Sequence, residues 1–194
     1  MQKFVFYTLF IIGSALFISC GTEDYSPKPK AFFRIDLPAK SYQIFDTLYP
    51  YSFEYPKYAK IQRSKGLGED KYWINVNFPN YNATIHITYR PIKNDLDSLI
   101  ENARKYVDKH ISKATSIKEK AYENPENKVY GVVYNIKGNS VASPYQFFAT
   151  DRKKHYLRGA LYFNMQPSND SLAPVIDFIE KDIDHLISTL KWRN

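Results

Sequence analysis

The chain has 194 residues, with 27 Lys and Arg against 20 Asp and Glu and a formal net charge of +7. This length suits one domain with a full hydrophobic core. The single cysteine, Cys20, excludes an intrachain disulfide and a cysteine-based metal cluster. The charge favours an anionic partner, such as a lipid headgroup, a glycan or an acidic protein face, and solubility alone explains it equally well.

The first 20 residues have the pattern of an export signal that ends in a lipid attachment site. Lys3 precedes a nearly continuous apolar run over residues 4–17, and the small residue Ser19 stands before Cys20. A helix over that run spans only about 21 Å, short of the roughly 30 Å hydrocarbon core, which favours a cleaved signal over a permanent span. "FISC" resembles the lipobox of bacterial lipoproteins, whose cysteine is linked to diacylglycerol and acylated on its amine. We therefore predict a signal peptide over residues 1–19, lipidation of Cys20, and an exported chain that does not meet nucleic acid.

Residues 20–30 have the composition of a flexible tether, because Gly21, Pro27 and Pro29 interrupt a polar stretch that has no periodicity. We expect a single domain over residues 31–194, since no internal repeat divides the chain. Glu23-Asp24 resembles a surface-export signal of some outer-membrane lipoproteins, and a solvated tether explains these residues at least as well. The leaflet that holds the anchor stays open.

The first half of the domain shows the alternation of a β-hairpin. In "KYWINVNFP" every second residue is apolar and faces one side, and "ATIHITYR" repeats the alternation after a turn. We expect strands over residues 73–78 and 83–89. A shorter strand over residues 52–55 is expected to begin the same sheet.

Two amphipathic helices are expected, over residues 95–112 and 171–191, because apolar residues recur there at the spacing of one buried face. Asn94 is the expected N-cap of the first helix and Asp170 that of the second. Pro174 falls in the first turn of the second helix, where no backbone donor is lost. The apolar stripe of the first helix contains Leu96, Leu99, Ile100, Ala103, Tyr106, Val107 and Ile111.

Strands are expected between the two helices over residues 129–136, 145–150 and 156–163, with another over 116–122. Strands joined by short turns, with helices inserted rather than alternating, predict an antiparallel sheet in an α+β domain. This order of elements is similar to the PsbP/Mog1-like fold.

The sequence contains no convincing catalytic constellation, so we predict that the chain is not an enzyme and holds no metal or cofactor. The four histidines, His86, His110, His155 and His185, fall on different expected elements. "KGLGED" lacks the Lys-Ser/Thr of a phosphate loop, and "GNSVAS" lacks the last glycine of a nucleophile elbow. Two alternatives stay open. A closed apolar pocket would favour a lipoprotein that binds a glycan or lipid, and a Ser–His pair or two carboxylates in a cleft would favour a cryptic hydrolase.

The segment over residues 138–151 is longer than a plain hairpin needs, so we predict an interaction surface that includes Asn139, Ser140 and Gln146. Asn139 and Ser140 favour turns for local reasons, and that interpretation has equal weight. Thr47, followed by Leu48, resembles an acceptor for bacterial O-glycosylation in an expected loop.

Several stretches resemble one family when taken in order behind the lipobox: "PKPKAFFRI", "YWINVNFPNYNATIHITYR", "GNSVASPYQFFATD" and "HLISTLKW". They are similar to the gliding motility lipoprotein GldD family over nearly the whole mature chain. The resemblance implies a non-enzymatic lipoprotein, needed for gliding, that supports the type IX secretion machinery for surface adhesins. It implies a lipid anchor in the membrane, expected in the outer membrane facing the periplasm, and partners from that machinery, with no small-molecule substrate. Only Cys20 maps as a functional residue.

Overall fold

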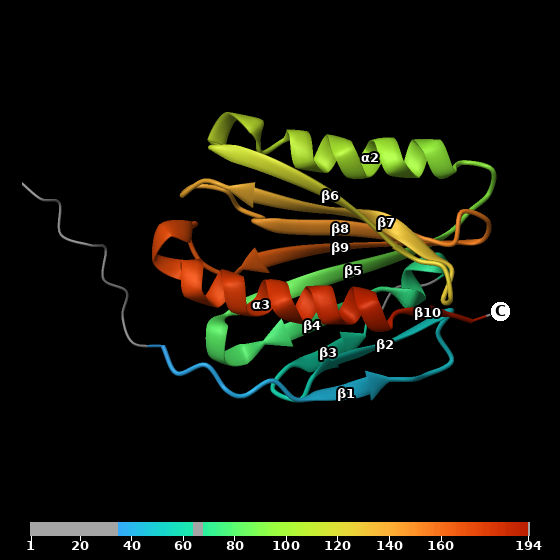
Figure 1. The fold of residues 1–194 in the computed structure, drawn as a ribbon, viewed down its shortest axis with the longest axis horizontal. Coiled ribbons are helices and arrows are strands. Elements are labelled where there is room, and N and C mark those ends of the chain that lie inside the picture. Colours follow the sequence, from blue (N-terminus) through green and yellow to red (C-terminus); the bar gives the residue numbers. More distant parts are fainter. Residues whose placement is uncertain (1–34, 64–67, 194) are drawn as a thin grey trace, which may run out of the picture. The chain divides into compact units, whose positions relative to one another are not determined.

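The chain folds around a seven-stranded antiparallel sheet, shown in Figure 1. A computed structural model describes residues 35–63 and 68–193, so Cys20, the signal peptide and the tether lie outside the described residues. In spatial order the strands are β3 (Lys60–Arg63), β4 (Ile74–Phe78), β5 (Ala83–Pro91), β9 (His155–Phe163), β8 (Tyr145–Thr150), β7 (Val129–Lys137) and β6 (Ser116–Asn124). All neighbouring pairs are antiparallel, which confirms the α+β class predicted from the sequence.

A second sheet of three strands joins the two ends of the described chain. It contains β1 (Tyr42–Phe45), β2 (Tyr51–Pro56) and β10 (Lys191–Trp192), with β2 in the centre. The expectation that the strand near residues 52–55 begins the main sheet is therefore wrong. The last strand of the chain pairs with β2, placing Trp192 opposite Tyr51, and a pairing between such distant segments leaves no local signal in the sequence.

The helices α2 (Leu96–Asp108) and α3 (Asn169–Thr189) pack against opposite faces of the large sheet. Along β8 the side chains alternate between these faces. Phe147 joins the core under α3, which includes Ile179 and Ile183, whereas Phe148 joins the core under α2. All six residues of β8 are buried, as expected for a strand covered on both sides.

The inner part of the predicted apolar stripe is confirmed, because Ala103 and Val107 are buried and Leu99 and Ile100 pack against them. Its outer part is wrong: Tyr106 is 45% exposed, and Ile111 is 59% exposed because α2 ends at Asp108, before the 3-10 turn that contains Ile111. The helix starts differ from the expectation. The residue before α2 is Asp95, since Asn94 adopts a left-handed backbone (φ 60°), and the residue before α3 is Ser168 rather than Asp170. Short 3-10 turns cover Gly68–Tyr72, Pro79–Tyr81 and Ile111–Lys113.

The strands expected over residues 73–78, 83–89, 116–122, 129–136, 145–150 and 156–163 all form, with ends shifted by two residues or fewer. The segment over residues 138–151 needs a correction, because its second half is β8, a central strand. The exposed part of that segment is limited to a short loop before β8.

The packing of α3 predicts a large difference between two leucines that undergo the same truncation. Leu186 is 1% exposed on the inner face of α3, and Leu48 is 98% exposed. Leu186→Ala should lower the free energy of unfolding by about 2–5 kcal/mol because it leaves a cavity. Leu48→Ala should change it by less than about 0.5 kcal/mol. Urea unfolding of the full-length chain measures both, and equal losses would contradict the packing of α3.

Candidate functional site

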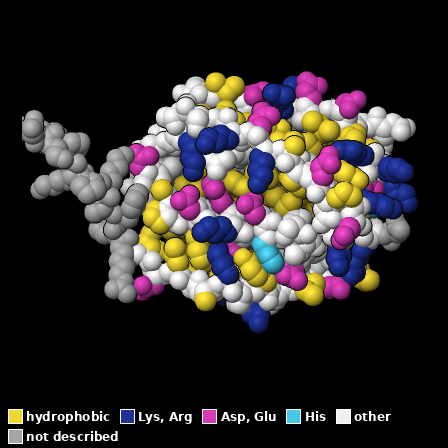
Figure 2. Space-filling model, in the orientation of Figure 1, with side chains coloured by type: hydrophobic (Ala, Val, Ile, Leu, Met, Phe, Trp, Pro, Cys, Tyr) yellow, Lys and Arg dark blue, Asp and Glu magenta, His cyan; other side chains and the backbone are white. Residues whose placement is uncertain are grey.

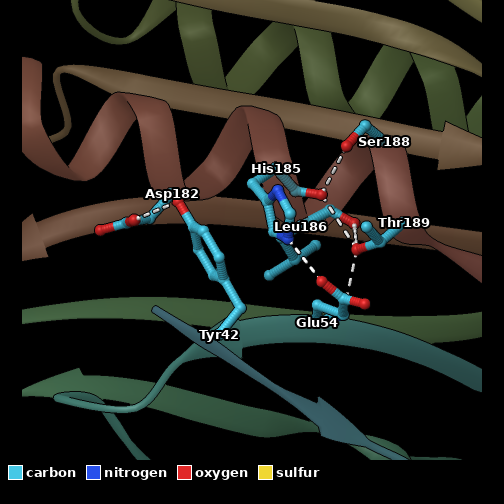
Figure 3. Close-up of polar contacts among 7 residues, drawn as sticks. All are labelled: Tyr42, Glu54, Asp182, His185, Leu186, Ser188 and Thr189. Carbon is cyan, nitrogen blue, oxygen red and sulfur yellow. Dashed lines mark hydrogen bonds and ion pairs between the residues drawn. The ribbon is translucent and has the colours of Figure 1, made fainter. Parts of the chain in front are cut away.

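A buried carboxylate on α3 gathers polar side chains from the N-terminal part of the described chain. Asp182 is only 1% exposed. Its Oδ1 accepts hydrogen bonds from Lys40 Nζ at 2.7 Å and from Tyr42 Oη at 3.0 Å, and its Oδ2 accepts one from Tyr58 Oη at 2.7 Å. We call these four residues the Asp182 cluster, and Figure 3 shows its Tyr42–Asp182 contact.

The electrostatics of the Asp182 cluster follow from burial. Burial lowers the pKa of Lys40, although its hydrogen bond to Asp182 opposes the shift. Burial, followed by the charge of Asp182, raises the pKa of Tyr42 to about 12, and the pKa of Tyr58 is also raised. Both tyrosines therefore remain protonated donors at neutral pH. Lys40 also donates to the Phe178 carbonyl at 2.8 Å, with its Nζ 3.2 Å from the centroid of that ring.

One turn further along α3, a His–carboxylate pair links the helix to β2 (Figure 3). His185 Nε2 lies 2.7 Å from Glu54 Oε2, and its ring stacks on Tyr42 with centroids 3.6 Å apart. Two hydroxyls further along the same helix bond to its backbone: Ser188 Oγ and Thr189 Oγ1 both donate to the His185 carbonyl oxygen. A hydrolytic triad needs a hydroxyl hydrogen-bonded to the imidazole. The described residues show no such contact at His185, and the contact with Glu54 joins α3 to β2.

A single perturbed acid lies on another part of α3. Burial raises the pKa of Glu180 to about 7; Lys137 opposes the shift, and Asp177 and Asp184 add to it. Its Oε1 accepts a hydrogen bond from Asn135 Nδ2 at 2.9 Å. A raised pKa is typical of a general acid. The cavity that Glu180 lines measures about 260 Å³, and the described residues lining it include no histidine that could act with it.

The predicted interaction residues have different environments. Asn139 and Ser140 are exposed in the loop between β7 and β8. Asn139 Oδ1 accepts a hydrogen bond from the Asp170 N–H at 3.1 Å, so this side chain joins the loop to the start of α3, which favours the turn interpretation. Gln146 is 2% exposed, and its Oε1 accepts a hydrogen bond from Arg158 at 2.8 Å. Its assignment to an exposed surface is therefore wrong, because β8 is covered by helices on both faces.

Thr47 lies in the loop between β1 and β2, as expected. Its hydroxyl Oγ1 is buried and has no hydrogen-bond partner in the described part of the chain, and its carbonyl oxygen accepts a hydrogen bond from Arg193. A glycan on this hydroxyl would require the loop to open. O-glycosylation of Thr47 stays a prediction.

A cleft of about 540 Å³ lies between part of α2 and the large sheet, and we call it the α2 cleft. It is lined in part by Trp73, Tyr106 and Tyr156 together with the cations Arg90, Lys93 and Arg158. The Arg158 guanidinium lies 4.2 Å from the Tyr106 ring centroid. The cleft is open to solvent and contains charged groups, so it differs from the closed apolar pocket that would indicate a carrier of a glycan or lipid.

Within residues 35–63 and 68–193, no three His, Cys, Asp or Glu side chains are grouped to hold a metal ion. Neither helix in the described part of the chain has the length and apolar character needed to cross a bilayer.

The fold and these contacts define an antiparallel α+β domain in which the polar groups between α3 and the N-terminal strands serve packing. The family described as "Gliding motility lipoprotein GldD" matches residues 22–192, and the chain belongs to this family. It is therefore a membrane-anchored envelope lipoprotein with a role in gliding motility, as the sequence resemblance implied.

Among solved structures the chain is similar to cyanobacterial PsbP (CyanoP) from Synechocystis sp. PCC 6803. The identity is 13%, the TM-score is 0.48, and the match covers 87% of this chain and 100% of that chain. No curated protein matches the chain significantly.

The Asp182 cluster predicts different effects for two aspartates on the same helix. Asp182→Asn removes the buried charge that faces Lys40 and should lower the free energy of unfolding by about 3 kcal/mol. Asp177 is 62% exposed and lies 3.9 Å from Lys137, so Asp177→Asn should cost less than about 1 kcal/mol. Urea unfolding of the two full-length variants measures the difference. An Asp182→Asn variant as stable as Asp177→Asn would show that the cluster does not hold the N-terminal strands.

Proposed function

We propose that this chain is a non-enzymatic scaffold lipoprotein, anchored through Cys20, that supports gliding by assisting the type IX secretion machinery for surface adhesins. Membership of the GldD family supports the motility role. One structural observation carries the non-enzymatic part. The His–carboxylate pair of His185 and Glu54 is used to fasten β2 to α3, and the neighbouring Ser188 hydroxyl bonds to the backbone.

The proposed organisation has three parts: a cleaved signal over residues 1–19, a tether over 20–30 and one domain over 31–194. The described residues from Ile35 onward belong to one compact unit, which suits a single folded domain carried on a tether. We further propose that the domain faces the periplasm from the outer membrane, with other components of the secretion machinery as its partners.

The anchor is tested by Cys20→Ser. Without the thiol, diacylglycerol cannot attach, so the variant should leave the membrane fraction or remain uncleaved, and gliding should be lost. Detergent phase partitioning and colony spreading measure the two effects, and Ser19→Ala, which keeps a small residue before the cysteine, is the control. A Cys20→Ser variant that is processed at the usual site and stays membrane-bound would contradict lipidation.

The non-enzymatic role is tested by His185→Gln, which keeps a donor toward Glu54 but removes a titratable base. Gliding and adhesin secretion should continue unchanged in cells that express this variant at the normal level. Glu180→Gln tests the carboxyl group whose pKa is raised, in the same assay, and should also leave both activities intact. Loss of gliding by either variant, with a folded protein in the membrane fraction, would indicate catalysis and overturn the scaffold role.

A second candidate function, binding of a glycan or lipid ligand, is favoured by the aromatic and cationic lining of the α2 cleft. Arg158 donates to Gln146, a neutral side chain that compensates its charge only in part. Burial lowers the pKa of Arg158, which shows that its charge is poorly solvated. Loss of gliding in Arg158→Gln, with folding intact, would favour this candidate over a pure scaffold.

A further inference from the structure

Three separate segments of the chain converge on a second, larger pocket. It is formed by the turn between β6 and β7, the turn between β8 and β9, and the terminal strand β10, and measures about 740 Å³. Figure 2 shows Lys and Arg side chains gathered at the right-hand end of the molecule, where Figure 1 places β10 and these two turns. We call this feature the basic pocket.

The lining of the basic pocket is strongly cationic. Five of its residues are Lys or Arg, against two acids, Glu126 and Asp151. Arg152 is partly compensated, because its guanidinium lies 3.3 Å from Glu123 and 3.9 Å from the Tyr130 ring centroid. The four lysines are exposed and make no ion pair with the described part of the chain: Lys128, Lys153, Lys154 and Lys191.

The backbone of the two turns holds these cations at some conformational cost. Lys128 and Arg152 have φ values of 53° and 64°, a left-handed conformation that glycine or asparagine adopts with less strain. In the β8–β9 turn, Asp151 Oδ1 accepts hydrogen bonds from the backbone N–H groups of residues 153, 154 and 155. These three hydrogen bonds fix the backbone of the turn, and with it the positions from which Lys153 and Lys154 extend.

A buried histidine in the lining has an unused ring nitrogen. His155 is 7% exposed, and its Nδ1 lies 2.9 Å from Tyr89 Oη. Its Nε2 is buried with no hydrogen-bond partner among the described residues, which is costly for a polar atom. The Trp192 indole stacks flat over this ring, with centroids 5.3 Å apart. Both rings line the pocket, and Trp192 belongs to β10, a strand of only two residues.

We propose that the basic pocket binds a phosphate group, contributed by an anionic lipid headgroup or by a soluble phosphate ester. The four lysines supply the charge, and His155 supplies a buried donor in the tautomer that carries its proton on Nε2, in which Nδ1 accepts from Tyr89 Oη. This inference is independent of the scaffold role, because it concerns a ligand and not a partner of the secretion machinery.

The side chains suit a phosphate group. Lysine binds phosphate as a point charge, and the pocket's one arginine already faces Glu123, so the four lysines are the cations that would bind it. Trp192 and Tyr130 add amphipathic rings, a residue type that is common where a protein meets a lipid headgroup layer. The volume of about 740 Å³ also admits a headgroup.

The test follows two ring nitrogens by NMR in the full-length chain, held in an uncharged maltoside detergent at physiological salt. Inorganic phosphate, glycerophosphoglycerol and phosphatidylglycerol in mixed micelles are added separately. We expect saturable shifts of the His155 Nε2 signal and of the Trp192 Nε1 signal, the latter because this group donates to the Lys128 carbonyl at 3.0 Å. A response to micellar lipid alone assigns the phosphate to a headgroup, and a response to the soluble compounds assigns it to free phosphate esters.

Two variants that lose the same number of charges distinguish binding in the basic pocket from non-specific electrostatic attraction of phosphate to the whole protein. Changing the four pocket lysines to Gln should raise the Kd at least about tenfold. Changing four exposed lysines elsewhere, Lys57, Lys60, Lys113 and Lys118, to Gln should leave it within about twofold. The proposal is overturned by equal weakening in both variants, or by the absence of a saturable His155 shift with all three compounds. Thermal unfolding of each variant verifies that the fold is intact.

Discussion

Phe147 lies directly opposite Gly159 across β8 and β9, and this contact sets the register of the centre of the large sheet. A Cβ atom at residue 159 would stand 2.1 Å from the phenylalanine ring, so only glycine admits the ring there. Because side chains alternate along a strand, a slip by one residue would move every buried group to the opposite face. Both faces of β8 are covered by a helix, and such a slip would therefore disrupt two cores at once.

The same register places the unusual polar groups of the domain. Phe148 lies opposite Arg158 and Gln146 opposite Ala160, which brings Gln146 and Arg158 to the face under α2 and allows their hydrogen bond. At the end of the same pair of strands, the turn at Asp151 sets the lysines beside His155. The α2 cleft and the basic pocket thus both depend on how β8 and β9 are aligned.

The helix α3 has a second role beyond covering the sheet. Its inner face supplies Ile179 and Ile183 to the core, while Asp182 and His185 hold the N-terminal strands through ionic and stacking contacts. These two titratable residues, which resemble catalytic groups by type, join the small sheet to the rest of the domain. The basic pocket differs, because its lysines form no ion pairs with the described residues and one of its histidine nitrogens has no partner. Because the described residues leave the charge of the basic pocket uncompensated, an anionic ligand is expected there and not at His185.

Local sequence patterns determined the elements of this protein. Period-two alternation located the hairpin of β4 and β5, and a stripe at helical spacing identified α2, because both patterns report which side of one element is buried. The lipobox and the ordered stretches from "PKPKAFFRI" to "HLISTLKW" identified the family, since they are read from the chain itself. Tertiary structure alone decided the features that depend on distant segments meeting. The pairing of β10 with β2, the burial of Gln146 between two helices and the meeting of Lys128, Lys153 and Lys191 around one pocket arise from contacts across long stretches of chain. Local periodicity carries no record of such contacts, because their free energy is gained only when the whole domain closes.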